Sequence, residues 1–127
     1  MKITNDKIET DFPFCNVYLE CGEGWYPLIW SCMKEIQKYC SRVDISPPKV
    51  LQIKEKFGGL RMYLAQIDNS GENPLLLNSF YDIMNIVERY ELISSLYCQM
   101  CGKAINERTR VNYHAICESC SNIKKNK

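Results

Sequence analysis

Four cysteines near the C-terminal end of the sequence have the spacing of a metal site. They are Cys98, Cys101, Cys117 and Cys120. Their C-x2-C-x15-C-x2-C pattern is typical of structural zinc sites. Two cysteines three residues apart can direct both sulfurs at one ion when the chain turns tightly, and Gly102 suits such a turn. We therefore predict one structural zinc ion with four thiolate ligands, which leaves no open position for catalysis.

Two alternatives remain open for this segment. The four thiols could be two unrelated buried pairs that bind no metal. His114 is the single histidine of the chain and lies three residues before Cys117, so it could replace one thiolate. We adopt the four-cysteine ligand set because four sulfurs already complete a tetrahedral site.

The other four cysteines have spacings of six, eleven and eight residues, which match no compact metal site. They are Cys15, Cys21, Cys32 and Cys40. Free cysteine is commonly a small buried hydrophobic residue, and we predict that role here. A second zinc ion or a reactive thiol is the alternative.

Charge is unevenly distributed along the chain. The formal net charge is +1, which argues against a strongly acidic DNA mimic and against general attraction to nucleic acid. Residues 98–127 carry +4 and residues 1–97 carry −3. A tetrathiolate zinc site would reduce the charge of the C-terminal segment to about +2. This basic segment is typical of a solvated end, with contact to nucleic acid or to an acidic protein as the alternative.

A β-hairpin is predicted around Gly58 and Gly59, since two strand-like runs, 49–56 and 60–67, flank a two-residue turn. In this register Lys56 lies opposite Arg61. The apolar face of the hairpin would contain Leu51, Ile53, Phe57, Leu60, Met62 and Leu64. The other face would contain Lys54, Lys56, Arg61 and Tyr63. Like charges placed opposite each other cost up to about 1 kcal/mol, so this second face is either solvated or binds an anion or an acidic partner.

Two helices are expected beside the hairpin, over residues 26–41 and from residue 74 to about 96. The first has an apolar stripe of Ile29, Cys32, Met33, Ile36 and Cys40. The second begins with Asn73 as its N-cap and has an apolar stripe of Leu76, Phe80, Ile83, Met84, Val87 and Tyr90. Residues 1–21 are expected to be irregular or strand-like.

The predicted fold class is α+β, with two helices packed on a small antiparallel sheet and followed by a C-terminal zinc ribbon. Residues 1–97 form the α+β core domain, 98–121 the ribbon, and 122–127 a flexible tail. No segment approaches 18 apolar residues and the N-terminal region has no continuous hydrophobic stretch, so we expect a cytoplasmic protein without a membrane partner. The sequence has no phosphate-binding glycine loop and no catalytic triad pattern, so we do not expect an enzyme.

Three segments together resemble a family of small phage and prophage proteins. They are Glu20-Cys-Gly-Glu-Gly-Trp-Tyr-Pro-Leu-Ile29, Gln52-Ile-Lys-Glu-Lys-Phe-Gly-Gly-Leu-Arg61, and the two C-terminal cysteine pairs. The family combines a GDGW-like turn, an EKFGGLR hairpin and a zinc ribbon. The turn has Glu23 where the family has aspartate, and the resemblance covers about half of the chain.

Within this set, the chain is similar to zinc-containing anti-CRISPR proteins that inhibit type II Cas9. The resemblance implies a protein made in the host cytoplasm during infection that binds a host defence protein, Cas9 or its guide RNA complex, and blocks loading of target DNA. The candidate partner surface includes the basic hairpin face and the zinc ribbon. One alternative is a nucleic-acid-binding zinc module that holds phosphate and stacks a base on this face. The other is a sponge for a nucleotide signal.

Overall fold

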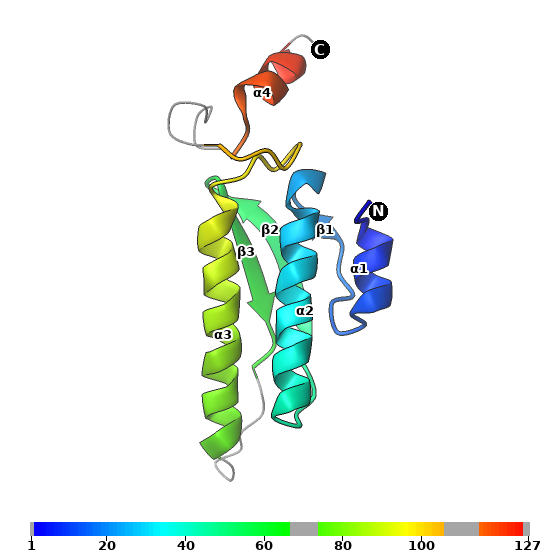
Figure 1. Cartoon of the computed structure of the whole chain (residues 1–127), viewed down its shortest axis with the longest axis vertical. Coiled ribbons are helices and arrows are strands. Elements are labelled where there is room, and N and C mark those ends of the chain that lie inside the picture. Colours follow the sequence, from blue (N-terminus) through cyan, green and yellow to red (C-terminus); the bar gives the residue numbers. More distant parts are fainter. Residues whose placement is uncertain (1, 67–73, 106–114, 126–127) are drawn as a thin grey trace.

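The computed structural model describes residues 2–66, 74–105 and 115–125, with side chains described for 2–66, 77–105 and 115–122. The fold class is α+β, as the sequence predicts (Figure 1). The elements in chain order are α1 (Asn5–Asp11), β1 (Leu19–Glu20), the 3-10 helix η1 (Glu23–Trp25), α2 (Tyr26–Arg42), β2 (Val50–Lys56), β3 (Gly59–Leu64), α3 (Pro74–Ser94) and α4 (Glu118–Lys125).

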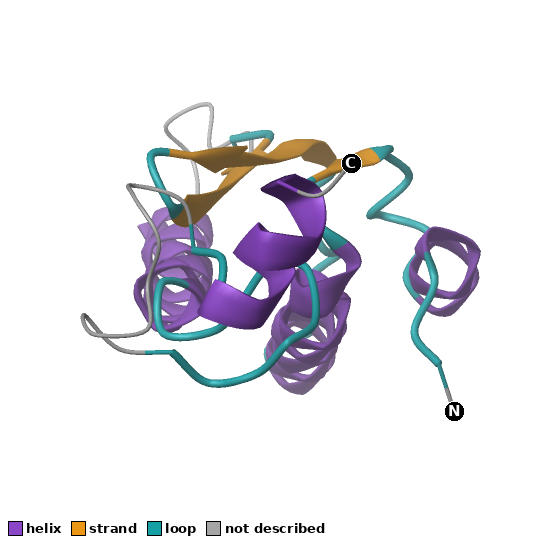
Figure 2. Ribbon diagram, turned by 90° about the horizontal axis from the view of Figure 1, so that it is seen from above, coloured by secondary structure: helices purple, strands orange, loops and turns teal. Residues whose placement is uncertain are grey.

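The molecule has a sheet layer and a helix layer. The strand order is β1-β2-β3, with β1 parallel to β2 and β2 antiparallel to β3. The sheet is therefore mixed, and the prediction of an antiparallel sheet is wrong for β1. Helices α2 and α3 pack side by side on one face of the sheet (Figure 2). Among the described elements, none covers the opposite face, which we call the uncovered sheet face.

Both predicted long helices are confirmed. Pro27 lies in the first turn of α2, where its missing N–H requires no hydrogen-bond partner. The complete predicted stripe of α2 is buried: Ile29, Cys32, Met33, Ile36 and Cys40. In α3, Ile83 and Val87 are buried, while Met84 and Tyr90 pack at the margin of the core. Asn73 and the side chain of Leu76 lie outside the described residues.

The hairpin register differs from the prediction by two residues. The turn consists of Phe57 and Gly58, both with positive φ (+53° and +82°), and Lys56 pairs with Gly59. A two-residue shift leaves every strand side chain on its original face, so the apolar alternation cannot distinguish the two registers. Consequently Lys54, and not Lys56, lies opposite Arg61.

Two predicted core residues of the hairpin are exposed for local reasons. Phe57 occupies the turn and is 78% exposed. Leu51 is 55% exposed, because the pairing is irregular between Val50 and Gln52; such a bulge redirects a side chain. Ile53 remains in the core as predicted.

The N-terminal segment contains a helix that the sequence does not predict. The side chain of Thr4 caps α1 by accepting a hydrogen bond from the N–H of Lys7 at 3.1 Å. Asn5 then connects α1 to β1, because its side chain accepts from the N–H of Leu19 at 2.9 Å and donates to the carbonyl of Val17 at 3.2 Å. The expectation of an irregular start is therefore wrong for Asn5–Asp11.

Two side chains of α3 satisfy N–H groups on the outer edge of β3. The N–H of Leu60 donates to Ser94 Oγ at 2.9 Å, and the N–H of Met62 donates to Glu91 Oε2 at 2.8 Å. Burial raises the pKa of Glu91, while the hydrogen bond from Met62 and the charge of Arg61 oppose that change. Helix α3 thus protects a sheet edge that would otherwise be open to pairing.

We expect Glu91→Ala to destabilise the protein by about 1–3 kcal/mol, because the Met62 N–H loses its partner. Glu91→Gln keeps a carbonyl acceptor without burying a charge and should stay close to the wild-type stability. Because the folded state raises the pKa of Glu91, the folded protein binds this proton more tightly, and any advantage of Gln over Glu should shrink as the pH falls through that pKa. Urea unfolding at several pH values measures both effects, and equal loss in the two variants would contradict the hydrogen-bond explanation.

Candidate metal centre and uncovered sheet face

The structure brings the four predicted metal ligands together. Cys98 and Cys101 follow α3, Cys117 directly precedes α4, and Cys120 lies in α4. Their sulfurs all lie within 4.8 Å of one another, and Cys101 Sγ and Cys117 Sγ are 3.7 Å apart. Zinc–sulfur bonds of about 2.3 Å in a tetrahedron place the sulfurs about 3.8 Å apart, so the donor set fits a metal ion such as zinc. His114 lies outside the described residues.

A tight turn presents the first cysteine pair. Gly102 has a φ of +81°, and its N–H donates to the carbonyl of Cys98 at 2.8 Å. The N–H of Cys98 donates to the carbonyl of Lys103 at 2.8 Å. These bonds fold residues 98–103 into a compact loop, and the positive φ agrees with the predicted turn at Gly102.

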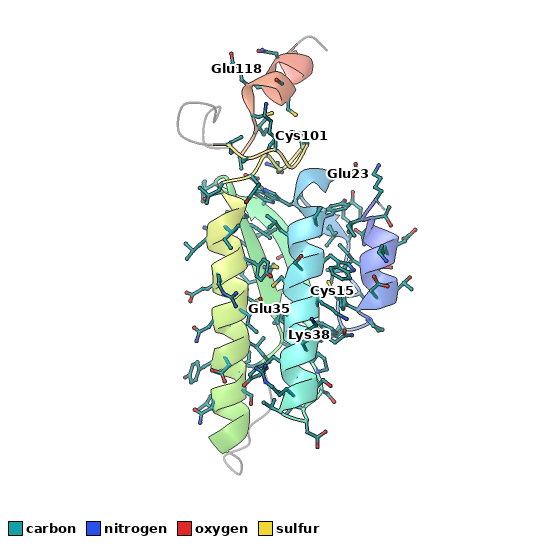
Figure 3. The ribbon with its side chains drawn as sticks, in the orientation of Figure 1. Cys15, Glu23, Glu35, Lys38, Cys101 and Glu118 are labelled. Atoms are coloured by element: carbon teal, nitrogen blue, oxygen red, sulfur yellow. The ribbon has the colours of Figure 1, made fainter. Side chains whose placement is uncertain are left out.

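The second pair is presented by a helix start. The N–H of Cys117 donates to Cys98 Sγ at 3.3 Å, which links the two halves of the centre. Helix α4 begins one residue later and continues to Lys125, so residues 122–125 are helical where the sequence predicts a flexible tail. Figure 3 shows Cys101 and Glu118 at the same end of the molecule, beyond the helix layer.

The local environment favours a thiolate at Cys98. Desolvation raises the pKa of this thiol, but hydrogen bonds from the N–H groups of Cys117, Cys101 and Met100 outweigh it and lower the pKa to about 7. The pKa of Cys120 is raised, first by desolvation and then by the neighbouring thiols. A metal requires deprotonated cysteines, and a bound cation would compensate the repulsion among four adjacent thiolates.

Residues 22–25, which we call the docking turn, hold the first cysteine pair against the core. The N–H of Gly24 donates to the carbonyl of Gln99 at 2.7 Å, and the N–H of Gly22 donates to Gln99 Oε1 at 3.1 Å. The buried indole of Trp25 donates from Nε1 to the carbonyl of Tyr97 at 2.9 Å. The cysteine loop is therefore attached to the core on both sides of Cys98.

The docking turn requires glycine because two backbone segments touch there. A Cβ on Gly24 would overlap the carbonyl oxygen of Cys98 and lie 2.5 Å from the N atom of Gly102. A Cβ on Gly22 would overlap the carbonyl of Gln99. The turn and the cysteines are both visible in the sequence, but their contact is not predicted from it. The signal that could have indicated the contact is the pair Gly22 and Gly24 just before the buried Trp25.

The remaining cysteines are packing residues. Cys15, Cys32 and Cys40 are buried, as predicted, and Cys21 is partly buried against the core. Burial raises the pKa of the Cys15 and Cys21 thiols to about 12 and also raises that of Cys32. Such thiols stay protonated and unreactive at neutral pH. Within the described ranges, the C-terminal four are the only group of potential metal ligands that lie close together.

The four predicted partner-binding residues share the uncovered sheet face. Lys54 and Arg61 are directly opposite each other on β2 and β3, and Lys56 and Tyr63 each lie two residues further along their strands. The ammonium of Lys54 lies 5.7 Å from the centroid of the Tyr63 ring, and this ring is 43% exposed. The face therefore combines three cations with an accessible aromatic ring.

Little negative charge balances this face. Glu20 of β1 is the register partner of Lys54 of β2. Its carboxylate accepts a hydrogen bond from Gln52 Nε2 at 3.0 Å. In the part of the chain that the structure describes, no carboxylate forms an ion pair with Lys54, Lys56 or Arg61. The charge of Arg61 acts on the Glu91 carboxylate at the edge of β3, so the least compensated cations of this face are Lys54 and Lys56.

Comparisons of the chain with protein-family models, curated proteins and solved structures find no match. The resemblance carried by the three sequence motifs therefore stays a prediction. No helix among the described residues is long and apolar enough to cross a membrane.

Proposed function

We propose that this protein is a non-enzymatic binding protein that holds a structural zinc ion at its four-cysteine centre and docks its partner on the uncovered sheet face. The observation that carries the proposal is the combination on that face of Lys54, Lys56 and Arg61, none of which forms an ion pair with a carboxylate among the described residues. Unbalanced charge on an accessible surface attracts a partner of opposite charge.

Zinc is the metal that best suits the four-cysteine centre. Four thiolates in a tetrahedron are typical of structural zinc sites. The centre is anchored to the docking turn through Gln99 and Tyr97, so a bound ion would stabilise the end of the molecule that follows α3. With four sulfur ligands, zinc has no position for a reactive water.

The described thiols also support a binding role without catalysis. A nucleophilic cysteine needs a lowered pKa, whereas burial raises the pKa of Cys15, Cys21 and Cys32. Cys98 has a lowered pKa, but it belongs to the proposed ligand set, where it would bind the ion.

The resemblance supports a narrower version of the proposal: a phage-encoded inhibitor, acting in the host cytoplasm, that binds a type II Cas9–guide complex and blocks target DNA loading. Two contacts agree with a common role for the three motifs. The docking turn holds the first cysteine pair through Gln99, and the hairpin is bonded to the end of α3 through Leu60 and Ser94. The three motifs would then form one rigid end of the inhibitor.

We expect purified protein to co-elute with a Cas9–guide complex and to protect target DNA from cleavage. The double variant Lys54→Glu, Arg61→Glu reverses the central charges of the uncovered sheet face and should lose both effects. The control Lys38→Glu, Arg42→Glu makes the same charge change at exposed positions of α2, where Figure 3 shows Lys38, and should retain them. Absence of co-elution and protection with the unmodified protein would refute the nuclease partner.

A further inference from the structure

We infer that the uncovered sheet face binds single-stranded nucleic acid, with phosphates on Lys54, Lys56 and Arg61 and a base stacked on Tyr63. This inference rests on the proposed use of that face as the docking surface, and it names the chemistry of the partner. The observations that carry it are the cation pair across β2 and β3, the exposed ring beside it, and the absence of a described element over the sheet.

The cation pair favours a polyanion. Lys54 and Arg61 are direct cross-strand partners, and two like charges in that position destabilise a sheet by up to about 1 kcal/mol. The guanidinium of Arg61 is held near the strand, because its Nη1 donates to the carbonyl of Leu60 at 3.0 Å. Gly59 leaves the space for it, since a Cβ there would lie 2.9 Å from Arg61 Nη1. A phosphate bound over the two strands would compensate both cations, which lie on the same face of the sheet.

The aromatic rings distinguish nucleic acid from an acidic protein. Tyr63 stands next to Lys54, with the ammonium 5.7 Å from its ring centroid, so one nucleotide can use both side chains. Phe57 extends the arrangement at the hairpin turn, where it is 78% exposed and Lys56 Nζ lies 5.7 Å from its ring centroid. Cations interleaved with exposed rings on an open sheet are the features of single-strand binding surfaces. Carboxylate side chains of a protein would use the cations but not the rings.

The number of cations on the uncovered sheet face determines the expected salt dependence of binding. Three cations that neutralise three phosphates give a slope of about −2 for the logarithm of the binding constant against the logarithm of salt concentration on a single strand. Removing two of them, Lys54 and Arg61, should reduce the slope to about −0.7. Removing a stacking ring should lower the affinity without changing the slope, because no counterion is involved.

The test is fluorescence anisotropy of labelled 12-nucleotide dT and U strands between 20 and 200 mM salt, with polyglutamate as competitor. A length of about 12 nucleotides lies within the range of site sizes of single-strand-binding modules. We expect binding with a slope of about −2, a slope of about −0.7 for Lys54→Gln, Arg61→Gln, and an unchanged slope for the control Lys38→Gln, Arg42→Gln. Tyr63→Ala should weaken binding about fivefold or more at constant slope, and Tyr63→Phe should restore it.

Three results would overturn the inference. They are no binding at 20 mM salt, equal binding by the Lys54→Gln, Arg61→Gln variant, and displacement by polyglutamate as effective as by unlabelled strand. If strands fail to bind while the Cas9–guide complex is still captured through Lys54 and Arg61, the face docks a protein, and the proposed function survives without this inference. If strands bind and no nuclease complex is captured, the inference stands and the proposed partner is wrong.

Discussion

Stripping the metal from the purified protein is expected to detach the cysteine loop from the core. We expect one zinc ion per chain. Structural zinc sites of this type bind with apparent free energies of about 10–16 kcal/mol, which equals or exceeds the stability of a typical domain. A strong chelator should therefore lower the melting temperature and change the near-ultraviolet signal of Trp25 and Tyr97, which are hydrogen-bonded to each other beside the loop. Much of the far-ultraviolet helix signal should persist, because α2 packs against α3 and α3 against β3, away from the four C-terminal cysteines.

Two cysteine variants distinguish the effect of losing the metal from the effect of losing a buried thiol. Cys117→Ser should release the zinc, since it removes one of the four sulfur ligands and leaves the backbone N–H that donates to Cys98 Sγ in place. Cys40→Ala removes a buried thiol of α2 and should lower stability while keeping one zinc per chain. Metal analysis and thermal unfolding provide the measurements. Metal well below one equivalent, together with an unchanged spectrum in chelator, would contradict the zinc centre.

Gly24→Ala is expected to be the most damaging small substitution in the docking turn. The added Cβ overlaps the carbonyl oxygen of Cys98 and approaches the N atom of Gly102 to 2.5 Å. Both neighbours are backbone atoms, so relief requires the cysteine loop to move away. We expect a loss of about 3 kcal/mol or more, at or above the usual cost of overpacking, and weaker zinc retention in competition with a chelator.

Gly59→Ala is the matched control for this substitution. Its Cβ would also be too close to a neighbour, 2.9 Å from Arg61 Nη1, but that atom is the far end of a flexible side chain. We therefore expect a small loss of stability and normal zinc retention. Similar losses in the two variants would show that the backbone contact at Gly24 does not hold the loop.

The helices and the ligand set could be predicted because both are local patterns. The apolar stripe of α2 repeats at helical spacing, and all five of its members are buried. The cysteine pairs need only short-range spacing to indicate a common metal. The pairing of the first strand and the capped helix α1 were missed, because β1 has two residues and α1 has seven, too few for a periodic signal.

The hairpin register and the docking turn could not be predicted for different reasons. Either of two turns, Phe57–Gly58 or Gly58–Gly59, keeps Ile53 and Leu60 on the same face, so burial does not select the register. The contact between Gly24 and Gln99 joins residues 75 positions apart, and no local pattern encodes such a partner. Gly22 and Gly24 indicate that another segment of the chain packs closely against residues 22–25, but they do not identify that segment.

The hydrogen bond from Trp25 to Tyr97 gives the molecule an intrinsic optical reporter. The chain has two tryptophans, and the other, Trp30, donates to Asp11 Oδ2 at 2.8 Å, at the end of α1. In a Trp30→Phe background, all indole emission would come from Trp25, whose ring is fully buried. Its hydrogen-bond partner, Tyr97, directly precedes Cys98, the first predicted zinc ligand. A shift of this emission to longer wavelength would signal loop release in real time, without a dye, during metal exchange or partner capture.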